Sequence, residues 1–222
     1  MHIGSGVYKV AGVDISSIYD DSAYLITYER CHIMIDAGSG AGLDNMLRNI
    51  AYVINDLKEI RYLILTHSHH RNSGGAYYMK SLNPDLQIIA HYPDSIYLRK
   101  PEKEYNMFID ELKDQKPVPV SLEIWDEIRT LKLCEDYIKI LYTPCHTRGS
   151  ISIAVMRGDL KYIFVGGLLE EIEKETYECK RSKEMIFNED PDILCGSIRC
   201  IYGRNNIYEH IWRTHIYEKR DV

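Results

Sequence analysis

The segment Thr66–Gly75, THSHHRNSGG, places three histidines within four residues. His67 and His69 are two positions apart, just after a strand pattern. Such a pair can turn both imidazoles toward one point, as a tetrahedral Zn²⁺ with Zn–N bonds of about 2.0–2.1 Å requires. His146, in the turn TPCHTRGS, also directly follows a strand pattern and is the best candidate for a third ligand. Each histidine alone is better explained as a polar residue at a strand end, but the three with their flanking turns favour a metal site.

A three-histidine site supports hydrolysis without a dedicated base. Three neutral imidazoles leave zinc with an open fourth position and can lower the pKa of a bound water to about 7. Arg71 and Asn72 follow the histidines. We expect both to flank the open position as catalytic donors to an anionic group or a developing oxyanion. One zinc ion is expected, with iron or manganese as alternative metals.

Strand and helix patterns alternate around these residues. Three strand-rich runs predict an antiparallel meander: 6–12, 22–29 and 32–38. Residues 41–57 carry apolar side chains at helical spacing and give the strongest helix pattern in the chain. The strand 61–66 ends at the histidine cluster, and a helix is expected at 75–80. Chemistry in open α/β sheets usually lies at such strand ends.

The second half repeats this style. Further strands are expected at 87–92, 137–143, 150–156, 161–167 and 191–197, with a closing amphipathic helix at 205–219. Strands followed by helix occur twice without a linker, so we expect a single domain over 1–222 with two packed sheets flanked by helices. The charged segment Pro93–Lys116 is expected to hold one or two helices, and 93–130 is a candidate lid or insertion.

These motifs resemble those of a known family. THSHHRNSGG resembles the T-H-x-H-x-D-H-x-G-G signature of the metallo-β-lactamase superfamily, and MIDAGSG and TPCHTRGSISI resemble its D-x-G strand end and its T-P-G-H-T-x-G-S-x turn. The resemblance covers nearly the whole chain. It implies an α+β, glyoxalase II-like metallohydrolase fold, a four-layer αβ/βα sandwich with two mixed β-sheets flanked by helices. Asp36 matches the family's strand-end aspartate, which supports the histidine loop from outside the ligand shell.

The resemblance also implies a degenerate second metal site. The family usually binds two metals, and His67, His69 and His146 match the ligands of the first. The positions matched to ligands of the second carry none: Arg71, Asn72, Gly167 and Ser197, with Arg204 an alternative match for the last. A guanidinium cannot ligate a metal and would repel a second cation. Glu170 or Glu171 could reach back as a substitute base, although a solvated acidic loop is the favoured interpretation.

Two functions follow from these residues. The first is a mono-zinc hydrolase of a small anionic ester or thioester. The alternative is a catalytically inactive protein of the same fold that serves as a binding or scaffold module. The complete three-histidine set favours the enzyme, whereas the missing carboxylates favour the alternative. A small-molecule substrate is the expected partner, and a homodimer through the apolar strands or the helix containing Trp212 is a further candidate.

Composition excludes several other classes. Lys and Arg total 27 against 33 Asp and Glu, a net charge of −6, and no basic run is dense enough to bind nucleic acid. The first residues lack an export-signal pattern, and no apolar run approaches the roughly 20 residues that span a bilayer. We therefore expect a cytoplasmic protein without a membrane partner. The six cysteines lack CxxC spacing and are expected to be mostly buried reduced thiols.

Overall fold

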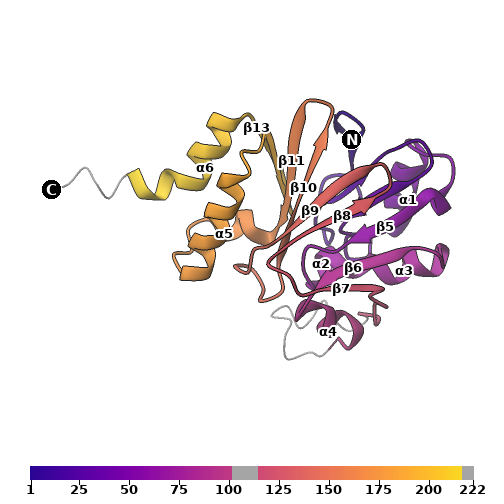
Figure 1. Cartoon of the computed structure of the whole chain (residues 1–222). Helices are drawn as coiled ribbons and strands as arrows, with labels where there is room; N and C mark the ends of the chain where they lie inside the picture. Colours follow the sequence, from indigo (N-terminus) through magenta and orange to yellow (C-terminus); the bar gives the residue numbers. More distant parts are fainter. Residues whose placement is uncertain (102–114, 217–222) are drawn as a thin grey trace.

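Two β-sheets face each other in the computed structural model, which describes residues 1–101 and 115–216, with side chains through Ile211 (Figure 1). The first sheet has seven strands in the order β1-β2-β3-β4-β5-β6-β7. Their bounds are His2–Gly4, Val7–Ala11, Ala23–Ile26, His32–Ile35, Ile60–Ile64, Gln87–His91 and Leu122–Ile124. The second has six in the order β13-β12-β11-β10-β9-β8. Here β8 to β13 span Ile128–Leu133, Asp136–Tyr142, Ile151–Arg157, Leu160–Gly166, Ile193–Gly196 and Cys200–Tyr202.

Both sheets mix parallel and antiparallel pairs. Strands β2 to β4 form the predicted antiparallel meander, β1 adds a further antiparallel strand that was not predicted, and β4 to β7 pair in parallel. In the second sheet, β8 to β11 are antiparallel and β12 pairs in parallel with β11. The parallel strands β4 and β5 end at the same edge of their sheet, so the segments that follow them, containing Asp36 and His67, lie together there.

Helices cover the outer faces of both sheets (Figure 1). Met46 of α1 (Leu43–Ala51) and Met79 of α3 (Gly75–Leu82) pack in one apolar cluster with the first sheet. Ile186 of α5 (Tyr177–Asn188) and Ile207 of α6 (Arg204–Ile216) pack with the second. A third cluster fills the space between the sheets. The predicted four-layer αβ/βα sandwich of two mixed sheets flanked by helices is confirmed.

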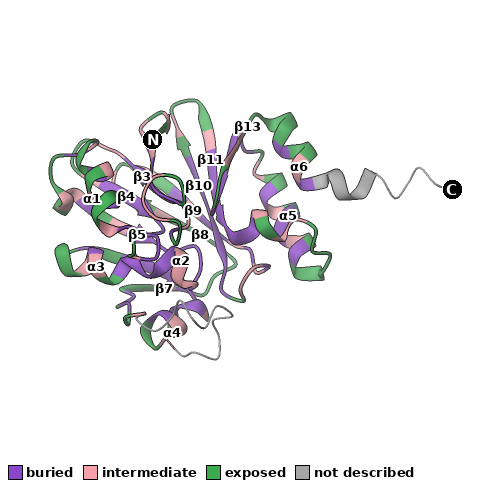
Figure 2. Ribbon diagram, turned by 180° about the vertical axis from the view of Figure 1, so that it is seen from behind, coloured by how far each residue is buried: buried purple, intermediate pink, exposed green. Residues whose placement is uncertain are grey.

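Alternation along the strands builds these layers. In β3, Tyr24 and Ile26 face the cluster between the sheets, whereas Ala23 and Leu25 face the helices. Successive side chains of a strand point to opposite faces, so a strand buried on both faces is apolar throughout. Figure 2 shows the result, with the central strands buried, the edge strand β8 mostly exposed and the helices exposed on their outer sides.

The first helix is shorter than its pattern. It ends at Ala51, although the apolar residues continue to Leu57. Asp56 accepts a hydrogen bond from the backbone N–H of Lys58 and begins a 3₁₀ turn, Leu57–Glu59. Short polar side chains that bond to nearby backbone compete with helix in this way. Val53 and Leu57 still pack on the core from this irregular segment.

The candidate lid at 93–130 divides into parts of different structure. Its first residues form α4 (Asp94–Arg99), residues 102–114 lie outside the described residues, and β7 and the start of β8 fall within 122–130. The last part therefore contributes the edge strands β7 and β8 of the two sheets. Sequence analysis did not separate these short strands from the charged segment before them.

All six cysteines are paired, so the prediction of reduced thiols is wrong. Cys31 bonds to Cys134, Cys145 to Cys179, and Cys195 to Cys200. The first pair joins the two sheets, the second joins the residue before His146 to α5, and the third crosses the β12–β13 pair. Disulfides are rare in cytosolic proteins, with intracellular proteins of hyperthermophiles as the exception. The disulfides therefore do not favour the expected cytoplasmic location, which stays a prediction.

Among the described residues, no helix combines the length and the apolar content needed to cross a bilayer.

Candidate metal centre

Three histidines from two loops converge at one edge of the sandwich. His67 and His69 lie between β5 and α2 (His70–Ser73), and His146 lies between β9 and β10. Their ring centroids are 4.7 to 4.9 Å apart, and each pair of rings is nearly perpendicular. Each ring offers one nitrogen, and the three nitrogens lie within 4.8 Å of one another. This group, predicted from sequence, can hold a metal ion.

His67 is oriented by a relay from Asp36. Thr66 Oγ1 lies 3.0 Å from His67 Nδ1 and donates to Asp36 Oδ2 at 2.7 Å. Because the hydroxyl hydrogen goes to the carboxylate, Thr66 Oγ1 accepts from Nδ1–H, which fixes the neutral tautomer. His67 Nε2 is buried and has no hydrogen-bond partner in the described structure. An orphaned imidazole lone pair facing two other rings fits a metal ligand.

His146 is oriented from its far side by Glu171. Glu171 Oε1 lies 3.2 Å from His146 Nδ1, so the carboxylate accepts from Nδ1–H and leaves Nε2 for a ligand. His146 Nε2 lies 2.9 Å from His69 Nδ1. Two nitrogens on one tetrahedral zinc are roughly 3.3 Å apart for bonds of about 2.0–2.1 Å. The donor set and its spacing therefore fit a divalent cation.

Burial favours the neutral forms of His67 and His69. Burial lowers the pKa of His67 well below its usual value, and the neighbouring histidines lower it further. Burial and His146 lower the pKa of His69 to about 4. Because a metal binds only the neutral imidazole, depressed pKa values keep both rings competent for binding below neutral pH.

A glycine pair closes the centre from the second sheet. Gly166 has φ +51°, and a Cβ there would lie 2.8 Å from Cβ of Thr66. A Cβ on Gly167 would lie 2.6 Å from Nε2 of His146. The position matched to the bridging aspartate thus packs directly against the ring of a ligand. A side chain there must displace His146.

Asn72 and Ser197 lie together behind the histidines. Asn72 is 0% exposed, and its Nδ2 donates to Asp36 Oδ2 at 3.1 Å and to Ser197 Oγ at 3.3 Å. The expectation that Asn72 is a catalytic donor at the open position is not met, because its donors are used inside the protein. Ser197 is also buried. Arg204, the alternative match, pairs with Asp190 and Asp192 at the start of α6.

Arg71 forms an ion pair with Asp21. Its Nε donates to Asp21 Oδ1 at 3.0 Å, a terminal nitrogen donates to the carbonyl of Ile18, and the side chain is 28% exposed. The backbone N–H of Asp21 also donates to the carbonyl of Arg71. Burial raises the pKa of Asp21, and Arg71 and then His146 oppose that shift. The guanidinium expected at the second site is therefore held by a carboxylate.

Glu171 could be predicted from the sequence as a residue near the centre, whereas Asp21 could not. Glu171 was considered as a substitute base but judged a solvated acid, and its contact with His146 shows that the loop does fold inward. Asp21 was not considered. It lies 50 residues from Arg71, and an isolated Asp-Asp pair in a loop matches no spacing typical of catalytic or metal-binding residues.

A family model matches most of the chain. The model for the metallo-beta-lactamase superfamily matches residues 20–196, a range that includes all three histidines. The chain belongs to this superfamily. Its members usually bind divalent metal, most often zinc, in agreement with the histidine cluster. No curated protein matches the chain significantly.

Solved metallo-beta-lactamases share the fold at low identity. A mutant of a HARLDQ-motif enzyme from Cronobacter sakazakii is 19% identical, with 99% of this chain and 95% of that chain covered and a TM-score of 0.79. A subclass B3 enzyme described as the first with an active-site glutamic acid is 16% identical, with 100% and 91% covered and a TM-score of 0.71. A third, from a soil metagenome, is 19% identical, with 96% and 81% covered and a TM-score of 0.67. These similarities show the superfamily fold alone.

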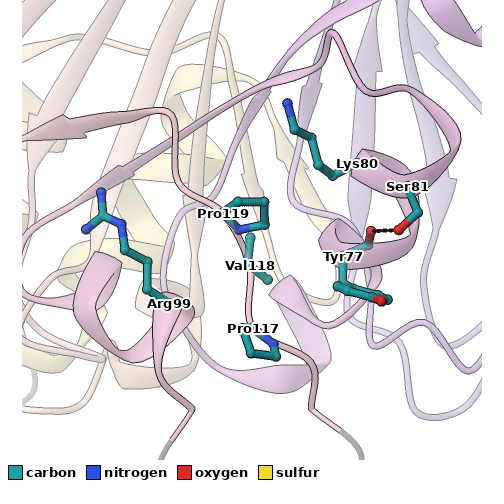
Figure 3. A pocket seen from close by; sticks show the side chains of 7 residues that line it. All are labelled: Tyr77, Lys80, Ser81, Arg99, Pro117, Val118 and Pro119. Carbon is teal, nitrogen blue, oxygen red and sulfur yellow. Dashed lines mark hydrogen bonds between the residues drawn. The ribbon is translucent and has the colours of Figure 1, made fainter.

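A separate pocket of about 400 Å³ lies between α3 and α4 and contains none of the histidines (Figure 3). Its lining residues are Tyr77, Lys80, Ser81, Arg99 and Pro117–Pro119. Both cations already have partners, because Lys80 donates to the carbonyls of Pro84 and Leu86 and Arg99 pairs with Glu123. We assign no function to this pocket.

Proposed function

We propose that the protein is a metal-dependent hydrolase with a single three-histidine zinc centre, acting on a small anionic ester or thioester. The observation that carries the proposal is the convergence of His67, His69 and His146, with the orphaned Nε2 of His67 directed into the group. A zinc ion held there would supply Lewis-acid chemistry, polarising a carbonyl oxygen and making water nucleophilic near neutral pH.

The residues around the centre have separable tasks. Thr66 and Glu171 hold the Nδ1 protons of His67 and His146, which keeps the opposite nitrogens available as ligands. Arg71 carries a permanent charge two residues after His69, and Asp21 fixes its direction. We assign Arg71 to attracting the anionic group of the substrate. The Gly167–His146 contact supports one metal rather than two.

A binding or scaffold module without catalysis is the second candidate. It is favoured by the positions matched to the missing ligands of a second metal, because the His146 ring packs against Gly167 and Asn72 is fully buried. Either function leaves the homodimer, the small-molecule partner and the cytoplasmic location as predictions.

Activity against a substrate panel separates the two candidates. Zinc-loaded protein is assayed with paired anionic and neutral esters, thioesters and lactones. The enzyme proposal expects turnover that is lost in His146→Ala. It also expects Arg71→Gln to raise KM for anionic substrates more than for their neutral counterparts. Metal-loaded protein that is inert on the whole panel favours the scaffold.

A further inference from the structure

Asp94 is a buried carboxylate far in sequence from the three histidines of the candidate centre. It is the first residue of α4 and is 1% exposed. Its Oδ2 accepts from the backbone N–H of Ser68 at 2.7 Å and from Thr147 Oγ1 at 2.8 Å. Its Oδ1 accepts from the backbone N–H of Gly149 at 2.9 Å. All three donors belong to loops that carry histidines of the candidate centre.

The three bonds join the two halves of the metal centre. Ser68 lies between His67 and His69, whereas Thr147 directly follows His146. The donors are 26, 53 and 55 residues from Asp94. One carboxylate therefore holds both histidine loops at a fixed separation. It contacts the backbone of the loops and a hydroxyl group, and these contacts involve none of the imidazole rings.

Packing leaves little freedom in this arrangement. A Cβ on Gly149 would lie 2.5 Å from both the backbone nitrogen and Oδ1 of Asp94, so only glycine allows the loop to come this close. The turn after His146 is also closed internally, because the backbone N–H of Thr147 donates to Ser150 Oγ at 2.9 Å. A shift of the Asp94 carboxylate must therefore move the whole turn that follows His146.

The chemistry of the contacts calls for an ionised carboxylate. An aspartate accepts hydrogen bonds on both oxygens, whereas an asparagine of the same shape has one acceptor and one NH₂. In Asp94→Asn the NH₂ would face at least one of the N–H or hydroxyl donors, leaving buried donors unpaired. The substitution preserves the volume of the side chain and replaces one of its two accepting oxygens with a donor.

We propose that Asp94 is a positioning residue for the metal centre, holding the His67–His69 loop and the His146 loop at the separation that lets one ion contact all three rings. The proposal rests on the three-histidine centre of the proposed function. It assigns to α4 a task that no sequence motif marked. Outer-shell partners of this kind typically change metal affinity by 10- to 100-fold when they are replaced.

The test compares Asp94→Asn with a matched control, Asp20→Asn. Asp20 is equally buried and accepts three hydrogen bonds, from the backbone and hydroxyl of Ser39 and from Ser16, and these partners belong to neither histidine loop. Zinc affinity is measured by chelator competition, and the Co²⁺-substituted proteins are compared by visible absorption. Asp94→Asn should weaken zinc binding by about 10- to 100-fold and alter the cobalt spectrum. Asp20→Asn should lower thermal stability while keeping wild-type affinity and spectrum.

Two variants of Thr147 with smaller structural changes test the proposal if Asp94→Asn does not fold. Thr147→Val removes one donor to Asp94 at constant shape, and Thr147→Ser keeps the hydroxyl. The valine variant should bind zinc more weakly, and the serine variant should restore affinity. Wild-type affinity in Asp94→Asn or Thr147→Val, or an equal loss in Asp20→Asn, overturns the proposal. A wild-type chain that binds no zinc instead overturns the proposed function.

Discussion

Gly167 lies directly against the imidazole of His146, so close that a Cβ on the glycine would be 2.6 Å from Nε2. The space matched to a bridging carboxylate is therefore occupied by the ring of a candidate ligand. We propose that the second site is absent both because ligand types are missing and because the ring of His146 fills part of its place.

Gly167→Asp should not create a second metal site. The new side chain must displace His146, so the variant should bind fewer metal ions than the wild type, with affinity reduced by about tenfold or more. Gly167→Ala should weaken binding in the same direction, because its Cβ alone is too close. Metal titration with calorimetry measures both. A gain of a second ion in Gly167→Asp would contradict this account.

Glu171→Gln should weaken metal binding by about tenfold. The neutral amide no longer offers a charged acceptor to His146 Nδ1, which reduces the preference for the tautomer with Nε2 available. Glu173→Gln is the control, since Glu173 is an exposed glutamate two residues further along the chain. Equal affinity of the two variants would remove Glu171 from the centre.

Acidification should remove the contribution of His69 to the stability of the metal-free protein. The pKa of His69 is lowered to about 4 in the folded state, while the unfolded chain keeps the usual value of about 6.5. Below pH 6.5 the unfolded state therefore binds more protons at His69, so the contribution of this residue to stability falls as the pH drops from 6.5 and levels off below 4. Asp36 and Glu170, whose pKa values burial raises to about 7, contribute with the opposite sign. Urea unfolding of apo-protein at several pH values measures the slope. His69→Gln should reduce it, and an unchanged slope would show that His69 is not responsible.

The three disulfides should contribute unequally to stability. Loop entropy predicts that Cys31→Ser/Cys134→Ser, which opens a separation of 103 residues, lowers the free energy of unfolding by about 4.7 kcal/mol. Cys195→Ser/Cys200→Ser, with a separation of 5, should lower it by about 2 kcal/mol. Chemical denaturation of apo-protein gives both values. Under reducing conditions the wild type should lose its advantage over both variants, and six titratable thiols in untreated, denatured protein would disprove the pairing.

Sequence analysis predicted the fold and the three ligands because both depend on local patterns. Strand-rich runs bounded by turns defined β2 to β6 and β9 to β12, and His67, His69 and His146 each follow a strand within a turn motif. Contacts between residues far apart in the sequence could not be predicted in this way. The disulfide between Cys31 and Cys134 joins residues 103 positions apart, and nothing near either cysteine marks the partner.

The supporting residues of the centre show the same limit. Asp36 was found because it ends a strand in a recognisable motif, and its contact with Thr66 gives it a place behind His67. Asp94 was not found, because its function depends on a fold that brings α4 to both histidine loops. Asn72 was assigned to the wrong side of the loop because a motif position gives no direction for a side chain.

The number of zinc ions bound per chain tests the central claim most directly. Protein loaded with excess zinc and freed of unbound metal is analysed for metal and protein content, beside His67→Ala, His146→Ala and Arg71→Asp. We predict one ion per chain in the wild type, none retained in either histidine variant, and no second ion in Arg71→Asp, because Gly167 and Ser197 still offer no ligand. Two ions per chain, or one ion retained without His67 and His146, would contradict a single three-histidine centre.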